Sequence, residues 1–167
     1  MAKLDIEVAR MELIGSGSDG PVYRISDDKV AKFEWAGGLG VPGGFFAVSP
    51  IGKRIQNESE VCKFLYENGV SVPKPYGIFR IKQPRGEMWS AIGVPRRFPA
   101  FVMEYLDAGG PRPENISELV EKERQKAITL GFKLHDAGYS DNTLWVPNRQ
   151  KVYLIDFSKW QLPGRTK

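Results

Sequence analysis

A chain of 167 residues, 41% hydrophobic and 26% charged, is long enough for one compact domain or two small lobes with a hydrophobic core. One cysteine, Cys62, and one histidine, His135, exclude an intrachain disulfide and argue against a zinc site of the usual ligands. The net charge of +4 comes from scattered Lys and Arg residues, which favours a solvated surface over a nucleic-acid partner. No apolar run is long enough to span a bilayer, and the first residues lack the apolar core of a signal peptide, so we expect a cytoplasmic protein that binds no membrane.

The first motif is the stretch IGSGSDGPVYRI, in which Gly15, Gly17 and Gly20 have the spacing G-x-G-x-x-G. Glycines at this spacing let backbone amides approach a phosphate closely. In a dinucleotide-binding fold the third glycine opens a helix, but here Pro21 and the strand-favouring letters VYRI follow it. Together with MELIG before the glycines and VAKFEW after a polar turn, the pattern predicts three strands, with the glycines in the bend of a β-hairpin. The alternative is an ordinary tight turn without a ligand.

The glycines are followed by Val22 and, on the next predicted strand, by the tripeptide V-A-K that ends at Lys32. This ordered pattern resembles the protein-kinase-like superfamily. The later segment YENGVSVPKPYGIF resembles in particular small atypical members such as the RIO-type kinases. The resemblance implies an ATP site in which Val22 and Ala31 contact the adenine. It also implies that Lys32 reaches the α- and β-phosphates. The alternative interpretation of Lys32 is an ordinary surface lysine with an exposed ammonium.

A helix is predicted after a glycine-rich segment. Ser49 is a favourable N-cap and Pro50 suits the first helical position. We expect the helix to continue to Asn68 and to end at Gly69.

This helix is expected to carry an acidic residue on its inner face. The apolar stripe consists of Ile51, Ile55, Cys62 and Leu65. Glu58 interrupts the stripe, and a carboxylate in such surroundings is costly unless it is paired. The resemblance implies Lys32 as its partner. Glu60 lies about 200° further around the helix, on the outer face. The alternative is a rotated helix with a solvated Glu58.

Two further strands separated by a polar excursion lead to the segment FVMEYLDAGG, which resembles a kinase hinge. The resemblance implies that Met103 lies beside the adenine. It also implies that the main-chain carbonyl of Glu104 and the amide of Leu106 bond the adenine edge. We therefore expect an N-lobe over residues 1–103 and a hinge with a reduced C-lobe over residues 104–167. The alternative is a core strand that enters a glycine-rich turn.

The segment PENISELVEKERQKAITLGFKLHDAGY predicts an amphipathic helix. Asn115 and Glu118 have the spacing of a capping box. The expected inner stripe consists of Ile116, Leu119, Val120, Ala127, Leu130 and Leu134. We interpret His135, at the end of this helix, as structural rather than catalytic.

The last motifs lie in YSDNTLWV and VYLIDFS. The strand that ends at Asp156 resembles the D-F-G strand, whose aspartate holds Mg²⁺ against the phosphates, although Ser158 replaces the glycine. Asn142 resembles the metal-binding asparagine, and Asp141 matches the catalytic base. The family has four residues between this aspartate and asparagine, whereas here the two are adjacent.

The sequence thus predicts an α+β, two-lobed, protein-kinase-like fold with an antiparallel N-lobe sheet and a strongly reduced C-lobe. The function expected from the resemblance is that of an ATP- and Mg²⁺-dependent phosphotransferase acting on Ser or Thr hydroxyls of an unidentified protein substrate. The alternative is a catalytically inactive pseudokinase that binds nucleotide or a partner protein and regulates it. The shortened loop after Asp141 is the feature that separates the two. A small-molecule kinase is a weaker third reading.

Overall fold

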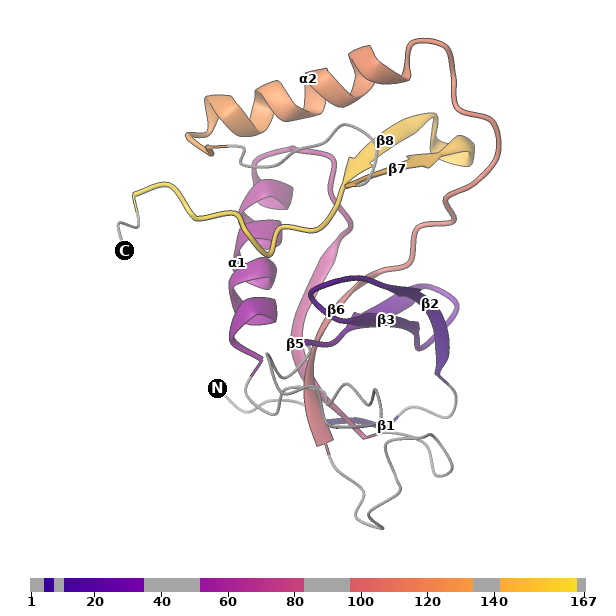
Figure 1. Cartoon of the computed structure of the whole chain (residues 1–167), viewed down its shortest axis with the longest axis vertical. Coiled ribbons are helices and arrows are strands. Elements are labelled where there is room, and N and C mark those ends of the chain that lie inside the picture. The colour runs from indigo at the N-terminus through magenta and orange to yellow at the C-terminus, as the bar shows by residue number, and fades with distance from the viewer. Residues whose placement is uncertain (1–4, 8–10, 35–51, 83–96, 134–141, 165–167) are drawn as a thin grey trace. The chain divides into compact units, whose positions relative to one another are not determined.

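The computed structural model describes residues 5–7, 11–34, 52–82, 97–133 and 142–164 (Figure 1). The chain divides into two compact units. Unit 1 comprises residues 1–56 and 76–105, and unit 2 comprises residues 57–75 and 106–167. The mixture of helices and mainly antiparallel strands confirms the predicted α+β class. Within the described ranges, no helix is both long and apolar enough to cross a membrane.

The described part of unit 1 is built on a six-stranded sheet with the order β1-β5-β6-β4-β3-β2. Its strands are β1 (Asp5–Glu7), β2 (Glu12–Ser16), β3 (Pro21–Arg24), β4 (Lys29–Lys32), β5 (Pro75–Lys82) and β6 (Arg97–Glu104). The pairs β2–β3, β3–β4 and β4–β6 are antiparallel, which confirms the predicted hairpin and the strand after it. The short β1 pairs in parallel with β5 and was not expected from the sequence.

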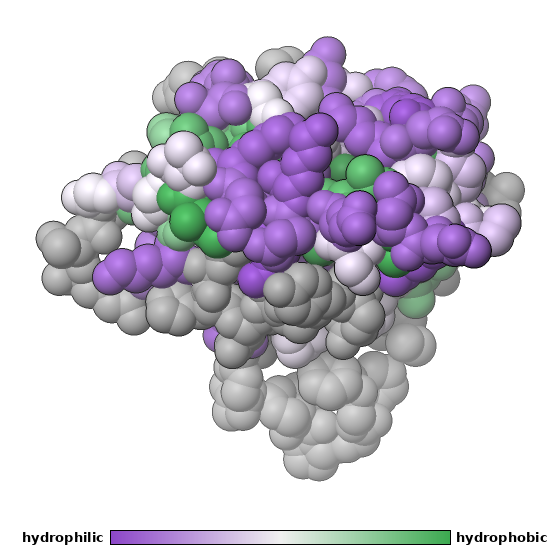
Figure 2. Space-filling model, turned by 90° about the horizontal axis from the view of Figure 1, so that it is seen from above, coloured by the Kyte–Doolittle hydropathy of each residue, from purple (hydrophilic) through white to green (hydrophobic). Residues whose placement is uncertain are grey.

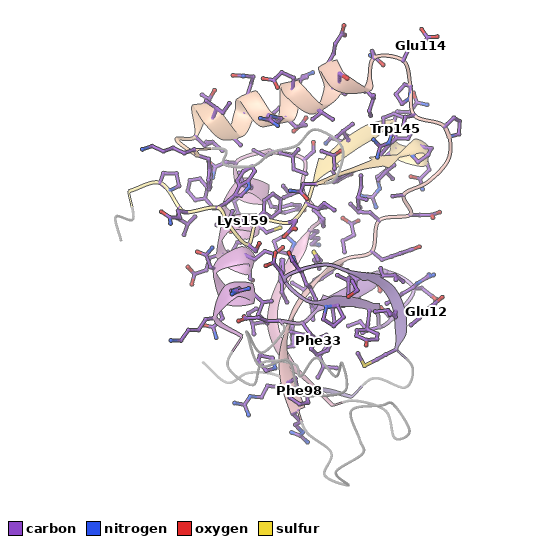
Figure 3. All side chains as sticks on the ribbon, in the orientation of Figure 1. Glu12, Phe33, Phe98, Glu114, Trp145 and Lys159 are labelled. Carbon is purple, nitrogen blue, oxygen red and sulfur yellow. The ribbon has the colours of Figure 1, made fainter. Side chains whose placement is uncertain are left out.

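One face of this sheet carries the hydrophobic core of unit 1. The core consists of Met11, Tyr23, Ala31, Phe33, Ile81, Ala100 and Val102, with Phe98 packed against it (Figure 3). The rings of Tyr23 and Phe33 meet edge to face, with centroids 5.8 Å apart. Because side chains alternate along a strand, the residues between these core positions lie on the opposite face.

Helix α1 (Lys53–Glu67) begins later than the start predicted at Pro50. The reason is Gly52, whose φ of 64° is left-handed and therefore breaks the helical path before Lys53. The predicted end is confirmed. Gly69 has a φ of 76°, its amide donates to the carbonyl of Tyr66, and the amide of Val70 donates to that of Leu65. These two bonds form a Schellman motif, which satisfies carbonyls of the last turn.

Unit 2 contains most of α1, helix α2 (Ile116–Thr129), and a hairpin of β7 (Thr143–Val146) and β8 (Lys151–Leu154) joined by the 3₁₀ turn η2 (Pro147–Arg149). Helix α2 packs against β8 (Figure 1). The surface seen in Figure 2 is largely hydrophilic, as the scattered charges predict.

Helix α2 is shorter than predicted. Gly131 has a φ of 93°, and the amide of Phe132 returns to the carbonyl of Ala127, so the helix ends before Leu134. Leu134 and His135 lie outside the described residues. The predicted capping box is wrong, because the side chain of Asn115, although in the N-cap position, makes no capping hydrogen bond.

The predicted boundary after residue 103 differs from the observed division, because residues 57–75 group with unit 2. The contacts explain this. The carbonyl of Ser71 accepts the amide of Leu154 at 2.8 Å, and the side-chain amide of Asn57 donates to the carbonyl of Trp160 at 2.9 Å. The rings of Phe64, Phe132, Trp160 and Phe157 follow one another in contact and form an aromatic core.

Candidate functional site

The glycine-rich bend, residues 15–20, consists of the last two residues of β2 and the turn that leads to β3. Its closing bond runs from the amide of Gly17 to the carbonyl of Gly20, at 3.2 Å. Gly20 is required by the fold, since a Cβ atom there would lie 1.8 Å from the carbonyl oxygen of Phe33. A Cβ atom on Gly15 or Gly17 would meet no described atom within 4 Å. Packing therefore explains one of the three motif glycines and leaves two without a steric reason in the fold.

Lys32 lies on the face of the sheet opposite to the core. It is directly across from Val22 on β3 and from Phe101 on β6, while Val30 is across from Met103. Directly opposed residues share a face, so all five side chains lie on one side of the sheet. Lys32 is only 7% exposed, and the surface lysine considered from the sequence is thus excluded.

Ala31 is placed differently from its predicted role. It lies opposite Tyr23 and Val102, is fully buried, and belongs to the core of unit 1. Its side chain consequently points away from the face that carries Val22 and Lys32. The residue that shares that face, two positions before Lys32, is Val30. Val30 rather than Ala31 therefore shares the face of Lys32, and a contact of either residue with adenine stays a prediction.

Glu58 lies on the inner face of α1, as predicted, and is 2% exposed, whereas Glu60 is exposed. The Oε1 atom of Glu58 accepts a hydrogen bond of 3.3 Å from the amide of Phe157. A buried carboxylate of unit 2 therefore contacts the main chain directly after Asp156. The predicted pair with Lys32 would join the two units and stays a prediction.

Asn142 and Asp156 flank the same end of the β7–β8 hairpin. Thr143 is paired with Leu154. The carbonyl of Asn142 accepts a hydrogen bond of 3.0 Å from the amide of Ile155. Asp156 follows at once and has a φ of 62°. Aspartate tolerates this left-handed region better than most residues, and such conformations concentrate at functional sites.

The residue types of Asn142 and Asp156 are compatible with the predicted Mg²⁺ site, which stays a prediction. A carboxylate and an amide carbonyl supply the oxygen ligands that Mg²⁺ prefers, and Mg²⁺ is usually held by one or two carboxylates together with substrate phosphates. Over the described ranges, no three His, Cys, Asp or Glu side chains gather into a group that would hold a metal by themselves.

The remaining predicted residues are placed in part. Glu104 ends β6 and lies across from Lys29, and the side chain of Leu106 packs with Val146 and Tyr153. The main-chain contacts of Glu104 and Leu106 with adenine stay predictions. Asp141 lies outside the described residues.

Two carboxylates with structural contacts were missed from the sequence. In unit 1, the Oε2 atom of Glu34 accepts the amides of Arg54 at 2.7 Å and Ile55 at 3.4 Å. In unit 2, the Oε2 atom of Glu123 accepts the amide of Ser71 at 2.8 Å. The amides that each carboxylate accepts belong to a segment far away in the sequence, so no local pattern predicts these contacts.

Two titratable groups of unit 2 have shifted pKa values. Burial, reinforced by the charge of Glu58, raises the pKa of the Cys62 thiol far above its usual range, which makes it unreactive. Burial also raises the pKa of Glu123, but hydrogen bonds from Lys126 and from the Ser71 amide outweigh it, so the pKa lies below the ordinary 4.5.

Comparison with models of known protein families gives no match for this chain, and no curated protein sequence is significantly similar to it. The resemblance to kinases therefore rests on the ordered sequence motifs.

Proposed function

We propose that the chain is an ATP- and Mg²⁺-dependent phosphotransferase with a protein-kinase-like fold that acts on Ser or Thr hydroxyls of a protein. The observation that carries the proposal is the contact between Glu58 and the amide of Phe157. The carboxylate of Glu58 is buried, which is costly without a compensating charge. Its partner, the amide of Phe157, directly follows Asp156, whose backbone is in the left-handed region. Such an arrangement is typical of a site rather than of a hydrophobic core.

The face of the unit 1 sheet supports the same proposal. It presents a buried ammonium, Lys32, beside the apolar side chains of Val22, Val30 and Met103. An apolar surface suits an adenine ring, and an ammonium suits phosphates. The glycine-rich bend adds backbone amides next to this face, and its first two glycines have no steric role in packing.

The residues divide the work as phosphoryl transfer requires, which is mainly positioning and charge stabilisation. Lys32 would orient the α- and β-phosphates. Asp156 and Asn142 would hold Mg²⁺, which neutralises phosphate charge when it is bound. Asp141 accepts the proton of the acceptor hydroxyl, whose oxygen bonds to the γ-phosphorus while the bond to ADP breaks.

The direct test is incubation of the full chain with γ-labelled ATP, Mg²⁺ and a mixture of Ser- and Thr-containing protein substrates. We expect slow transfer that is lost in Asp156→Ala and Lys32→Met. The matched control is Lys122→Met, which removes the same charge from an exposed position on α2. Wild-type transfer no greater than that of Asp156→Ala contradicts the proposal.

The adjacency of Asp141 and Asn142 favours a second candidate, the pseudokinase. Neighbouring side chains of an extended segment point to opposite sides, so both can serve only if the chain turns between them. A pseudokinase predicts that ATP raises the melting temperature while no phosphate is transferred. The same two measurements on one preparation therefore separate the candidates.

A further inference from the structure

The first turn of α1 is connected to the end of β4. Glu34 follows Lys32 by two residues and is 9% exposed. Its carboxylate accepts the amides of Arg54 and Ile55, which belong to the first turn and have no partner within the helix. A negative charge is also favourable at a helix N-terminus. Glu34 consequently fixes the main chain of Arg54 beside the strand of Lys32.

The side chain of Arg54 reaches the glycine-rich bend. Its Nη1 atom lies 3.5 Å from the Oδ1 atom of Asp19, which is located between Gly17 and Gly20. The side chain of Asp19 is 17% exposed and that of Arg54 is 55% exposed. The bend is thereby joined to the helix turn that Glu34 holds in place.

The charge of Asp19 has a second consequence. A carboxylate inside a bend that receives phosphates repels them, and the repulsion increases with the number of phosphate charges. A guanidinium at 3.5 Å offsets this charge while it holds the bend.

We propose that Arg54 is a positioning residue: through Asp19 it holds the glycine-rich bend and neutralises it for phosphate, and Glu34 keeps Arg54 in place. The nucleotide part rests on the proposed function, whereas holding the bend does not. The role predicts an effect of Arg54 that depends on the number of phosphates in the ligand, which a purely structural role does not.

The first measurement is amide hydrogen exchange of the full chain without ligand. Arg54→Gln keeps the main-chain bond to Glu34 and removes the ion pair. Because partly exposed pairs are weak, we expect exchange at residues 15–20 to be about two- to fivefold faster. Lys53→Gln is the matched control, since it removes the neighbouring exposed charge, and it should leave these amides unchanged. If the amides of residues 15–20 exchange at the same rate in Arg54→Gln as in the wild type, the proposal is overturned, whatever the chain binds.

The second measurement is titration with ATP, ADP and adenosine. In Arg54→Gln the affinity should fall about fivefold for ATP, less for ADP and not for adenosine. The double variant Asp19→Asn/Arg54→Gln also removes the negative charge of Asp19 and should recover part of the loss. The neutralising role is overturned if Arg54→Gln loses the same affinity for all three ligands. It is also overturned if the double variant binds ATP more weakly than Arg54→Gln does. If the wild-type chain binds none of them, the proposed function fails and hydrogen exchange alone decides the holding role.

Discussion

Glu58 and Phe157 are 99 residues apart in the sequence, yet the carboxylate of one accepts the amide of the other at 3.3 Å. This bond fixes the middle of α1 to the main chain that follows Asp156. Because Glu58 is 2% exposed, its charge has lost most of its hydration, and it depends on the groups around it. The contact therefore links the stability of unit 2 to the candidate site.

Substitution of Glu58 tests this link. Glu58→Gln keeps an oxygen acceptor for Phe157 but removes the charge, so we expect weaker ATP binding with a small change in unfolding free energy. Glu58→Ala leaves a buried amide without its acceptor and should destabilise the protein by about 1–3 kcal/mol. Urea unfolding and ATP titration measure the two effects. Glu60→Gln, on the exposed face, is the control, and an equal loss of affinity in that variant would reopen the choice between the two glutamates.

The two faces of β4 give a second prediction. Val30→Ala removes apolar surface from the face that carries Lys32 and should lower ATP affinity about fivefold. Ala31→Gly alters the core side and should lower the unfolding free energy by about 1 kcal/mol without changing the affinity of the folded chain. Isothermal titration and thermal unfolding separate these outcomes. The opposite pattern, with affinity sensitive to Ala31, would restore the role first predicted for that residue.

The position of Ala31 in the core shows which part of the site the sequence could predict. The letters V-A-K identified the strand and its lysine, but strand alternation decides which valine or alanine shares the face of Lys32. Glu58 was predictable because it interrupts an apolar stripe on a single helix. Glu34 and Glu123 were not, because each accepts amides from a distant segment and nothing nearby in the sequence reports that contact.

Helix ends were predicted unevenly for a similar reason. Gly69 and Gly131 both end a helix with a left-handed residue, but only the first was recognised. The apolar period continued past Gly131 as far as Leu134, and this favoured a longer helix. A glycine inside an apolar pattern is thus better interpreted as a C-terminal signal when an apolar residue follows it, as Phe132 does here.

The motif glycines are expected to respond differently to alanine. Gly20→Ala would place a Cβ atom against the carbonyl of Phe33, so the hairpin must shift and the protein should be strongly destabilised. Gly17→Ala meets no described atom within 4 Å and should fold normally while ATP affinity falls. Circular-dichroism melting followed by nucleotide titration distinguishes the two. Unchanged ATP binding by Gly17→Ala would mean that the bend does not contact phosphate.

Glu123 makes the stability of unit 2 depend on pH. Its pKa is lowered in the folded state, so its contribution is present above the ordinary value of 4.5 and is lost as pH falls through the folded pKa. We expect Glu123→Gln to cost about 1 kcal/mol at pH 7 and less at pH 3.5. Unfolding free energies at both pH values test this. The exposed Glu114→Gln serves as the control, and a cost for Glu123→Gln that does not change with pH would exclude the ionised carboxylate as the cause.

Asp156 combines a proposed metal ligand with a left-handed backbone, and three substitutions separate the two properties. Glycine adopts a φ of 62° without strain and alanine does not, so Asp156→Gly should be more stable than Asp156→Ala by about 1 kcal/mol. Both variants lack the carboxylate, and both should lose phosphate transfer. Asp156→Asn tolerates the backbone and keeps one oxygen donor, so we expect it to fold normally with strongly reduced transfer. Transfer assays beside urea unfolding give both readouts. If Asp156→Gly retains transfer while Asp156→Ala does not, the backbone conformation rather than the carboxylate is what the site requires.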